Sequence, residues 1–596
     1  MTRKQDYFLE MANLPSITRL GGGFVLRRHR LSSRLLLLAA GPLLAGCVAA
    51  AQPDPASLAA PAAAPSAPVE VRLHLAAEPE TLDPAQTADA ALIDVVGHLM
   101  EGLVAPGGTP EAAGGVAERW ESADGRRFVF YLRPDARWSD GAPVTAHDFV
   151  RSWLHLLDPA VGAVNAHLLY EIAGAEAYSG LDPAAPDFRE QAGALQEAVQ
   201  VTALDDRRLQ VTLRAPNPAW PGYTAHPALA PRRAGVPFGA VTNGPFVLAG
   251  AGRADAGPAV SGGTALRLER NPHYWNRENI HIDAITYHVE PDPLEALRLF
   301  QMGHLHLVLL PADLAAQVPG SQAMAQPATM GLVFNAGQPR LADADLRRAI
   351  ALALETDRVT AEAVGEAGLP ARSLVPPSLA GGWPPGYGAH PAAGNGLWSE
   401  GSLVGELLAG ALPGEVQAEA RRLWSEALAR LGLGRMTLSL LHAEEATALA
   451  RAVRRSLEER LEGLTIELHT VPFAQRLERV RFGQFDLVLQ GWVAEHDDPL
   501  ALLAPFTTAH PGNAARWVSA EYDARVAGAG STAGAERTAA LLEAERLLLH
   551  EAPVVPIYHP LRHWAVRPEL EGLEFRPLGA RFDLRHARLA PATPAR

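Results

Sequence analysis

The sequence predicts an α/β protein made of several domains, and three observations support this prediction. The chain has 596 residues, which is more than a single hydrophobic core holds together. Its composition, 48% hydrophobic and 20% charged, is that of a globular protein. Strand patterns at 436–441, 464–468 and 485–489 alternate with helical patterns, of which 446–461 is the clearest. This alternation is typical of βαβ units.

Residues 1–46 have the pattern of a secretory signal peptide. Four arginines between positions 27 and 34 precede an apolar run at 35–45, which is too short to span a bilayer. Cys47 is the only cysteine, so its thiol is free, bridged to another chain or covalently modified. It follows Leu44-Ala45-Gly46, which resembles the lipobox of bacterial lipoproteins. We therefore expect a lipid anchor at Cys47 and an extracytoplasmic, periplasmic location on a membrane.

The Ala/Pro-rich stretch at 47–68 is typical of a flexible tether that connects such an anchor to a folded body. The body begins with a strand at 71–75, and its first helix is expected to end in Met100-Glu101-Gly102-Leu103. In the next block, Gly115 to Pro159, we expect a strand at 128–132, a turn at 139–141 and a helix capped by Thr145 and Asp148. That helix carries one apolar face, formed by Phe149, Val150, Trp153, Leu154 and Leu157.

Further along the chain, apolar periodicity predicts helices at 345–359 and 418–432, the second ending at Gly432. The run Val554 to Tyr558 is an apolar strand pattern. The Gly- and Pro-rich stretch at 381–414 is expected to be a loop.

Several motifs, taken in their order along the chain, resemble those of the peptide/nickel-type (family 5) extracellular solute-binding proteins of ABC importers, and most of all the oligopeptide-binding members. The matching segments are the Gly115 to Pro159 block, Glu78 to Pro84, Met100 to Leu103, Thr242 to Phe246 and Leu268 to Asn276. The resemblance implies a type II periplasmic-binding-protein-like fold, with two lobes around a ligand cleft and an extra domain.

This fold implies three domains, the first of them discontinuous. Domain I is expected at 69–105, returns at 241–335, and returns again at 556–596 together with a C-terminal tail. Domain II is expected at 106–240 and domain III at 336–555.

The segment Gly491-Trp492-Val493-Ala494-Glu495 follows the strand pattern that begins at Phe485, and it matches the ligand-facing block of the family. The resemblance implies that Glu495 pairs with the α-amino group of a ligand, since a buried ammonium needs an anionic partner. It implies that backbone groups of Gly491 and Val493 pair with an extended peptide as with an added strand. Trp492 and Phe473 are then candidate walls of side-chain pockets.

The sequence also departs from the family pattern. Peptide binders carry a basic residue two positions before the Gly-Trp pair, where this chain has Leu489, and a second basic position falls in 443–448, where no residue is basic. An anchor for an amine is thus recognisable, whereas an anchor for a carboxylate is not. The ligand is either a peptide that is held differently or another amine-bearing or glycosylated solute.

We expect a monomeric substrate-binding subunit of an ABC importer, which captures peptides and delivers them to permease and ATPase subunits, with no cofactor and no catalytic residue. The net charge of −14 argues against a nucleic-acid partner. One alternative is a sensor or adhesin derived from the same fold. Another is a lipoprotein peptidase that uses Glu495 and His496. A metal site at His496, Asp497 and Asp498 is only weakly indicated, and we expect none.

Overall fold

The computed structural model describes residues 68–79, 81–86, 89–105, 114–249, 265–379 and 413–590. From Val69 onward these residues form one compact unit. The expected signal peptide, the Cys47 anchor, nearly all of the tether and most of the loop at 381–414 lie outside the described residues, so they stay predictions. Among the helices that are described, none is long and apolar enough to cross a membrane.

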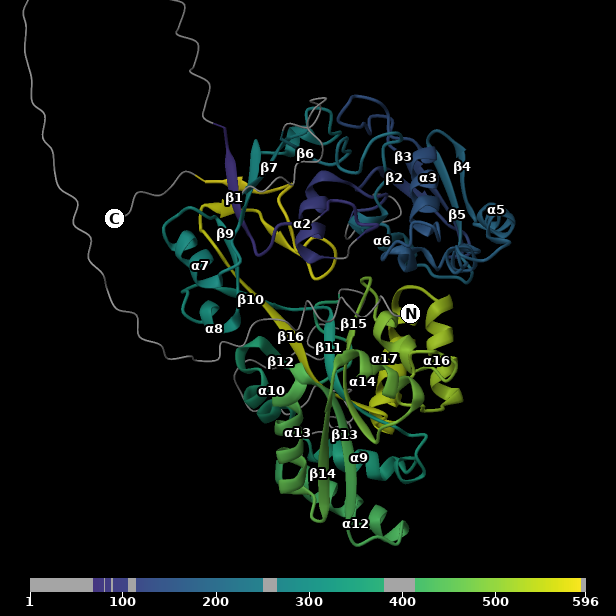
Figure 1. The fold of residues 1–596 in the computed structure, drawn as a ribbon, viewed down its shortest axis with the longest axis vertical. Helices are drawn as coiled ribbons and strands as arrows, with labels where there is room; N and C mark the ends of the chain where they lie inside the picture. Colours follow the sequence, from purple (N-terminus) through teal and green to yellow (C-terminus); the bar gives the residue numbers. More distant parts are fainter. Residues whose placement is uncertain are drawn as a thin grey trace, which may run out of the picture. The chain divides into compact units, whose positions relative to one another are not determined.

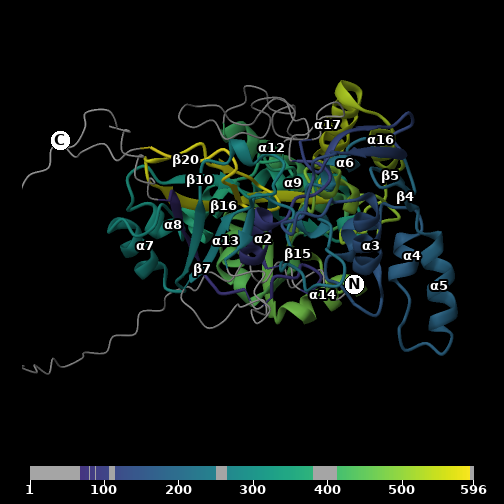
Figure 2. The same cartoon turned by 90° about the horizontal axis from the view of Figure 1, so that it is seen from above.

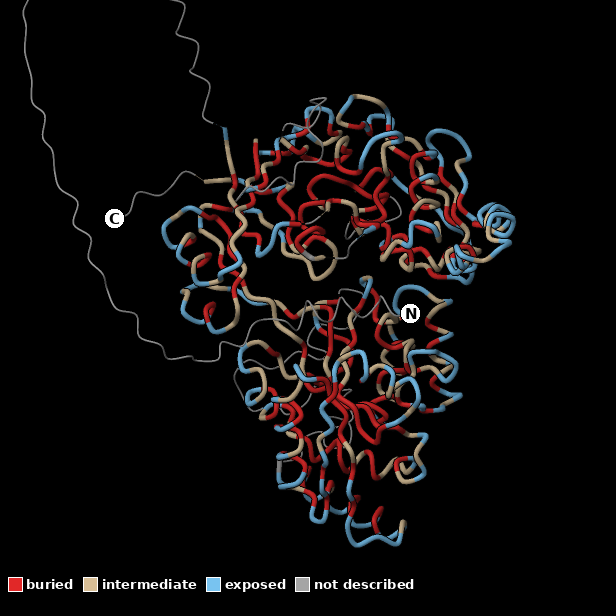
Figure 3. Tube along the Cα trace, in the orientation of Figure 1, coloured by how far each residue is buried: buried red, intermediate tan, exposed pale blue. Residues whose placement is uncertain are grey.

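The centre of this unit is a large mixed sheet, which confirms the predicted α/β class (Figure 1). Over the described residues, ten strands follow one another across it: β14 (Leu464–Val471), β13 (Met436–Ala443), β15 (Leu487–Val493), β11 (Ala328–Phe334), β16 (Val554–Val566), β9 (Leu307–Leu310), β1 (Glu70–Leu75), β8 (Ala284–Val289), β7 (Ala265–Arg270) and β6 (Phe246–Leu248). Two further strands, β10 (Gln322–Ala325) and β12 (Gly368–Pro370), pair with β16. Most residues of β11, β13 and β15 are buried, as expected for strands covered on both faces (Figure 3).

The long strand β16 joins two parts of this sheet and is drawn in yellow in Figure 1. Its first half, up to Pro560, pairs with β11 and β12. Its second half, from Leu561 to Val566, pairs with β10 and β9. The expected strand at 554–558 is therefore real but continues for eight more residues, to Val566. The interruption at Pro560 hides this continuation, because proline in a strand pattern suggests an end.

A second, four-stranded sheet is built from β2 (Ala117–Glu121), β3 (Arg127–Leu132), β5 (Arg208–Thr212) and β4 (Val201–Asp205). The helix α3 (Ala146–Leu157) contacts β4 and β5. The helix starts where predicted, after Thr145. The backbone N–H of Thr145 donates to Asp148 at 2.9 Å, as in the expected capping box. Phe149, Trp153 and Leu157 are buried, whereas Val150 and Leu154 are only half-buried.

Helices pack against these two larger sheets. Figure 2 shows α4 (Ala175–Ser179) and α5 (Phe188–Ala198) side by side at one edge of the unit. The remaining α-helices of the described chain are α2 (Ala90–Leu99), α6 (Trp220–Tyr223), α7 (Pro293–Gln301), α8 (Ala312–Ala315), α9 (Ala344–Ala353), α10 (Thr356–Ala363), α12 (Pro413–Arg430), α13 (Thr447–Arg460), α14 (Phe473–Phe482), α15 (Leu500–Leu503), α16 (Ala520–Ser531) and α17 (Gly534–Glu551).

Two helix predictions need correction. The single helix expected at 345–359 is two helices, α9 and α10, because the backbone leaves the helical conformation at Leu354, where ψ is 112°. The first helix ends at Leu99 instead of Leu103, since Met100 is already extended. By contrast, α12 stops where expected, with Gly432 at a φ of +69° after the last turn.

Three motifs that carry the family resemblance meet around the buried carboxylate of Glu101. Tyr274 Oη donates to it at 2.6 Å and Trp275 Nε1 at 2.7 Å. The side chain of Asn243 exchanges two hydrogen bonds with the backbone of Glu101. Burial raises the pKa of Glu101, and the nearby Arg585 guanidinium opposes that rise. The motifs thus share a packing role, because they close one buried polar cluster.

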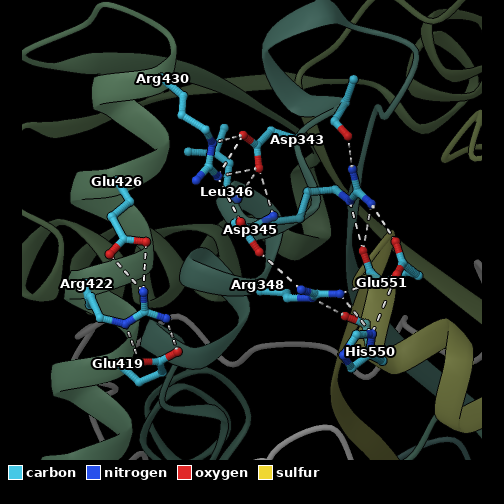
Figure 4. A network of polar contacts seen from close by, with 12 residues as sticks. Asp343, Asp345, Leu346, Arg348, Glu419, Arg422, Glu426, Arg430, His550 and Glu551 are labelled. Carbon is cyan, nitrogen blue, oxygen red and sulfur yellow. Dashed lines mark hydrogen bonds and ion pairs between the residues drawn. The ribbon is translucent and has the colours of Figure 1, made fainter.

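The helices α9, α12 and α17 are tied together by a network of charged groups (Figure 4). Asp343 caps α9 by accepting from the backbone N–H groups of Asp345 and Leu346, and Arg430 of α12 donates to both of its oxygens. Arg348 of α9 reaches the end of α17, where it pairs with Glu551 at 3.3 Å. One carboxylate, that of Asp343, therefore serves a helix cap and an interhelical ion pair together.

Candidate ligand-binding site

The Gly-Trp motif lies inside the strand β15, which is a correction of the sequence expectation. The strand was expected at 485–489 with the motif after it, but it spans Leu487–Val493. β11 pairs with it along its whole length, from Phe334 opposite Leu487 to Ala328 opposite Val493. Gln490 and Gly491 interrupt the apolar pattern, so the sequence alone ends the strand too early.

The other edge of β15 is only partly paired. β13 pairs with it at Leu487 and Val488, and over the described residues no strand continues that pairing beyond Val488. Ala494 N–H donates to Pro327 on the β11 side, whereas Leu489 C=O accepts from the Arg476 side chain. Because alternate residues direct their backbone groups to opposite edges, Gly491 and Val493 share the direction of Leu489. Their N–H and C=O groups therefore point to the open edge.

The two predicted aromatic walls have different surroundings. Trp492 is buried, with 8% of its surface exposed, and its ring centroid lies 5.3 Å from that of Phe506. Phe473 begins α14 directly after Pro472 and is half-buried. The guanidinium carbon of Arg476 lies 4.9 Å from the centre of the Phe473 ring. In this structure Trp492 packs in the core, while Phe473 and Arg476 form a pair on the first turns of α14.

Glu495 follows the end of β15, and 39% of its side chain is exposed. One carboxylate oxygen lies 3.4 Å from Nε2 of His167, in the 3₁₀ helix Ala166–Leu169. The other ring nitrogen of His167, Nδ1, lies 3.0 Å from the carbonyl oxygen of Val164. If Nδ1 donates to that carbonyl, the contact with Glu495 is an ion pair only when the imidazole is protonated. Glu495 thus presents an accessible carboxylate beside the imidazole of His167.

Beyond Glu495, the chain is fixed by a buried polar cluster. The carboxylate of Asp498 is fully buried and accepts from Arg537 at 2.6 Å and from Tyr223 Oη at 3.0 Å. The His496 ring lies on that of Tyr223, with 3.8 Å between their centroids. Burial, reinforced by the charge of Asp498, raises the pKa of Tyr223 well above its usual value. Asp498 is therefore engaged in holding the loop.

This arrangement does not favour the weak metal signal of the sequence. Asp498 is engaged by Arg537 and Tyr223, and His496 is stacked on an aromatic ring. Among the described residues, no group of three or more His, Cys, Asp and Glu side chains is arranged to hold a metal ion.

Sequence reasoning missed four residues that adjoin the motif. His167 and Tyr223 come from the segment before residue 240, and Arg537 comes from α17. Arg476 lies 13 residues before Leu489 and touches its carbonyl. No local pattern marks the first three, because their partners are distant in sequence. Arg476 could have been found from the sequence, because it occupies a position of α14 that otherwise suits a buried apolar side chain.

Comparison with known proteins places this geometry in a family. Residues 111–514 match the sequence profile described as bacterial extracellular solute-binding proteins, family 5 Middle. The chain is similar to a dipeptide-binding protein of Bacillus subtilis, with 26% identity over 86% of this chain and 90% of the relative. It is also similar to the periplasmic murein peptide-binding protein of Escherichia coli, with 28% identity over 84% and 90%.

A solved structure of similar fold is the unliganded open form of the periplasmic murein tripeptide-binding protein MppA. It superposes with a TM-score of 0.72 and 25% identity, and the match covers 88% of this chain and 99% of that one. The sequence profile over residues 111–514 and the fold match over 88% of the chain agree with each other. The chain belongs to the bacterial extracellular solute-binding proteins of family 5.

Proposed function

We propose that this chain is the peptide-binding subunit of an ABC importer and that it holds the peptide backbone along the open edge of β15. The observation that carries the proposal is the direction of the Gly491 and Val493 backbone groups, which point away from β11. An extended peptide pairs with such an edge through main-chain hydrogen bonds, whatever its side chains are. The names of the relatives, which describe binding of dipeptides and murein peptides, support the same class of ligand.

Glu495 is the group that would recognise the amino end of the peptide. Its carboxylate is accessible, it follows the open edge directly, and the imidazole of His167 lies 3.4 Å from it. A charge-assisted hydrogen bond to an ammonium contributes about 1.5–3 kcal/mol, which corresponds to about 10–150-fold in affinity. Such a pair fixes the direction of the peptide along β15, with the amino end beyond Val493.

The test uses the mature protein purified without denaturation. Native mass spectrometry is expected to show retained peptides, and calorimetry with a short peptide is expected to give binding that N-acetylation weakens by about 10–150-fold. Glu495→Gln should remove the difference between free and acetylated peptide. Asp497→Asn, which neutralises an exposed carboxylate two residues further on, is the matched control and should preserve that difference.

Three outcomes count against this function. Absence of any peptide binding would overturn it. Cleavage of the peptide during the measurement would favour the peptidase alternative. Normal peptide uptake in a strain that lacks the protein would favour a sensor or adhesin.

Anchoring and delivery complete the proposal. The lipobox-like pattern before Cys47 supports lipid attachment, and the family supports delivery to a permease. Cys47→Ser is expected to move the protein from the membrane fraction to the soluble fraction and to abolish labelling by a radioactive fatty acid. Membrane association that survives this change would argue against a lipid anchor at this position.

A further inference from the structure

Arg476 on α14 is a buried cation with little to neutralise it. Only 6% of the residue is exposed. Its side chain makes one weak hydrogen bond, from Nη1 to the Leu489 carbonyl at 3.4 Å, and contacts the Phe473 ring. A guanidinium carries five N–H donors. Among the residues that the structure describes, no carboxylate lies within ion-pair distance of it, and none supplies a second hydrogen bond to its side chain.

Two other buried arginines have strong partners. Arg537 pairs with Asp498, and Arg347 donates to the carbonyl oxygens of Leu341, Ala342 and Glu551. Burial lowers the pKa of Arg476 to about 10, and the charge of the exposed Glu445 opposes this effect. An unpaired buried charge costs free energy. A buried guanidinium of this kind is therefore a suitable partner for an anion, which neutralises its charge on binding.

The position of Arg476 relates it to the open edge of β15. Leu489, whose carbonyl it contacts, is the first residue of β15 beyond the pairing with β13. Glu495 lies at the other end of that edge, six residues further on. At about 3.3 Å per residue this separation is about 20 Å. A cation and an accessible carboxylate therefore lie at opposite ends of one unpaired backbone edge.

We propose that Arg476 binds the C-terminal carboxylate of the ligand, so that the ligand is a short zwitterionic peptide held antiparallel to β15. This inference rests on the proposed function. The free N–H groups of the guanidinium suit a carboxylate, which accepts two parallel hydrogen bonds from arginine. Peptides of about three to five residues extend about 10–17 Å at about 3.4 Å per residue, and a hydrogen bond of about 3 Å at each end brings this to the span of about 20 Å. The charge that Leu489 lacks is thereby supplied from the neighbouring helix.

The test compares three forms of one tetrapeptide by calorimetry: the free peptide, its C-terminal amide and its N-acetyl derivative. The wild-type protein is expected to bind the free acid about 10–150-fold more tightly than the amide. In Arg476→Met, which preserves the aliphatic packing, the acid-to-amide ratio should fall to about 1 while the penalty for N-acetylation stays unchanged. Arg481→Met removes an exposed charge from the same helix and should leave the ratio as in the wild type.

The two proposals fail in different ways. If no form of the peptide binds, the proposed function is overturned, and this inference with it. If peptides bind but the wild-type protein does not distinguish acid from amide, or if the ratio survives in Arg476→Met, only the anchor is overturned. A ratio lost in Glu445→Gln and kept in Arg476→Met would also overturn it. The unchanged N-acetyl penalty shows within the same experiment that the Arg476→Met site is folded.

Discussion

Arg537 and Asp498 form an ion pair at 2.6 Å in which 9% of the arginine side chain and none of the aspartate side chain is exposed. The pair ties the loop after β15 to α17, and Tyr223 Oη adds a second donor to the same carboxylate. Glu495 is only three residues away from this fixed point. The carboxylate that we assign to the ligand amine therefore extends from a backbone held on both sides, by β11 before it and by Asp498 after it.

Removing one partner of this pair is expected to be costly. Asp498→Ala leaves the Arg537 guanidinium buried without its counter-charge, so the free energy of unfolding should fall by about 3–5 kcal/mol. The double change Asp498→Leu with Arg537→Met replaces both charges by apolar groups and should recover most of that loss. Urea unfolding followed by far-UV circular dichroism measures both values. A loss below about 1 kcal/mol for the single change would contradict this reasoning.

A buried histidine beneath the site predicts a dependence of stability on pH. Burial lowers the pKa of His559 from 6.5 to about 4. Its Nδ1 lies 2.9 Å from Oγ1 of Thr329, and Thr329 is the β11 residue opposite Trp492. The unfolded chain takes up a proton below pH 6.5 that the folded chain refuses until about pH 4. The contribution of His559 is thus complete above pH 6.5 and is lost as the pH falls toward 4.

In His559→Asn the amide nitrogen can replace Nδ1. The fall in the free energy of unfolding between pH 6.5 and pH 4 should therefore be smaller than in the wild-type protein, by about 3 kcal/mol. Other buried histidines contribute with the same sign in both proteins, so the difference between them isolates His559. Parallel pH profiles for the two proteins would show that the histidine does not titrate as described.

The network of Figure 4 allows a comparison between two acidic residues. Asp343 caps α9 and pairs with Arg430, so Asp343→Ala should destabilise the protein by about 1–2 kcal/mol. Within the described part of the chain, Glu426 pairs only with Arg422 of its own helix, and 48% of its side chain is exposed. Glu426→Ala should therefore cost less than about 0.5 kcal/mol. Equal losses in thermal or urea unfolding would mean that the cap of α9 has no special role.

Two glycines form a second matched pair. A Cβ atom at Gly331 in β11 would lie 2.9 Å from the Val555 carbonyl oxygen and 3.0 Å from the Trp492 ring. Gly331→Ala should therefore cost about 1–3 kcal/mol and change the fluorescence of Trp492. Gly528 lies in α16 with no atom within 4 Å of its added Cβ, so Gly528→Ala should stabilise by about 0.5–1 kcal/mol. Unchanged stability and fluorescence in Gly331→Ala would indicate that β11 shifts without strain.

Local signals explain which elements could be predicted from the sequence. The start of α3 is encoded by Thr145 and Asp148, three residues apart, and the end of α12 by Gly432. Strand boundaries were less accurate, because pairing with a neighbour overrides composition. β15 continues through Gly491 since β11 is there to pair with it, and β16 continues through Pro560 since its partners change at that point.

The site could be predicted only in part, for the same reason. Glu495 and Gly491 belong to a contiguous motif, so a reader of the sequence finds them together. Tyr223 and Asp498 are 275 residues apart, and only the folded chain brings them within a hydrogen bond. The burial of Arg476 is likewise a property of the packed helix α14, because its sequence neighbours Arg479 and Arg481 are more exposed.

The change of partners along β16 has a mechanical consequence. Because one continuous strand belongs to both halves of the large sheet, those halves cannot separate by sliding apart. A rotation between them involves the few peptide units of β16 between Tyr558 and Leu561, where one set of hydrogen bonds ends and the next begins, and the connection from Ala325 to Ala328 between β10 and β11. Pro560 makes this segment of β16 stiffer, since its ring fixes φ, one of the backbone torsions that would have to change in such a rotation.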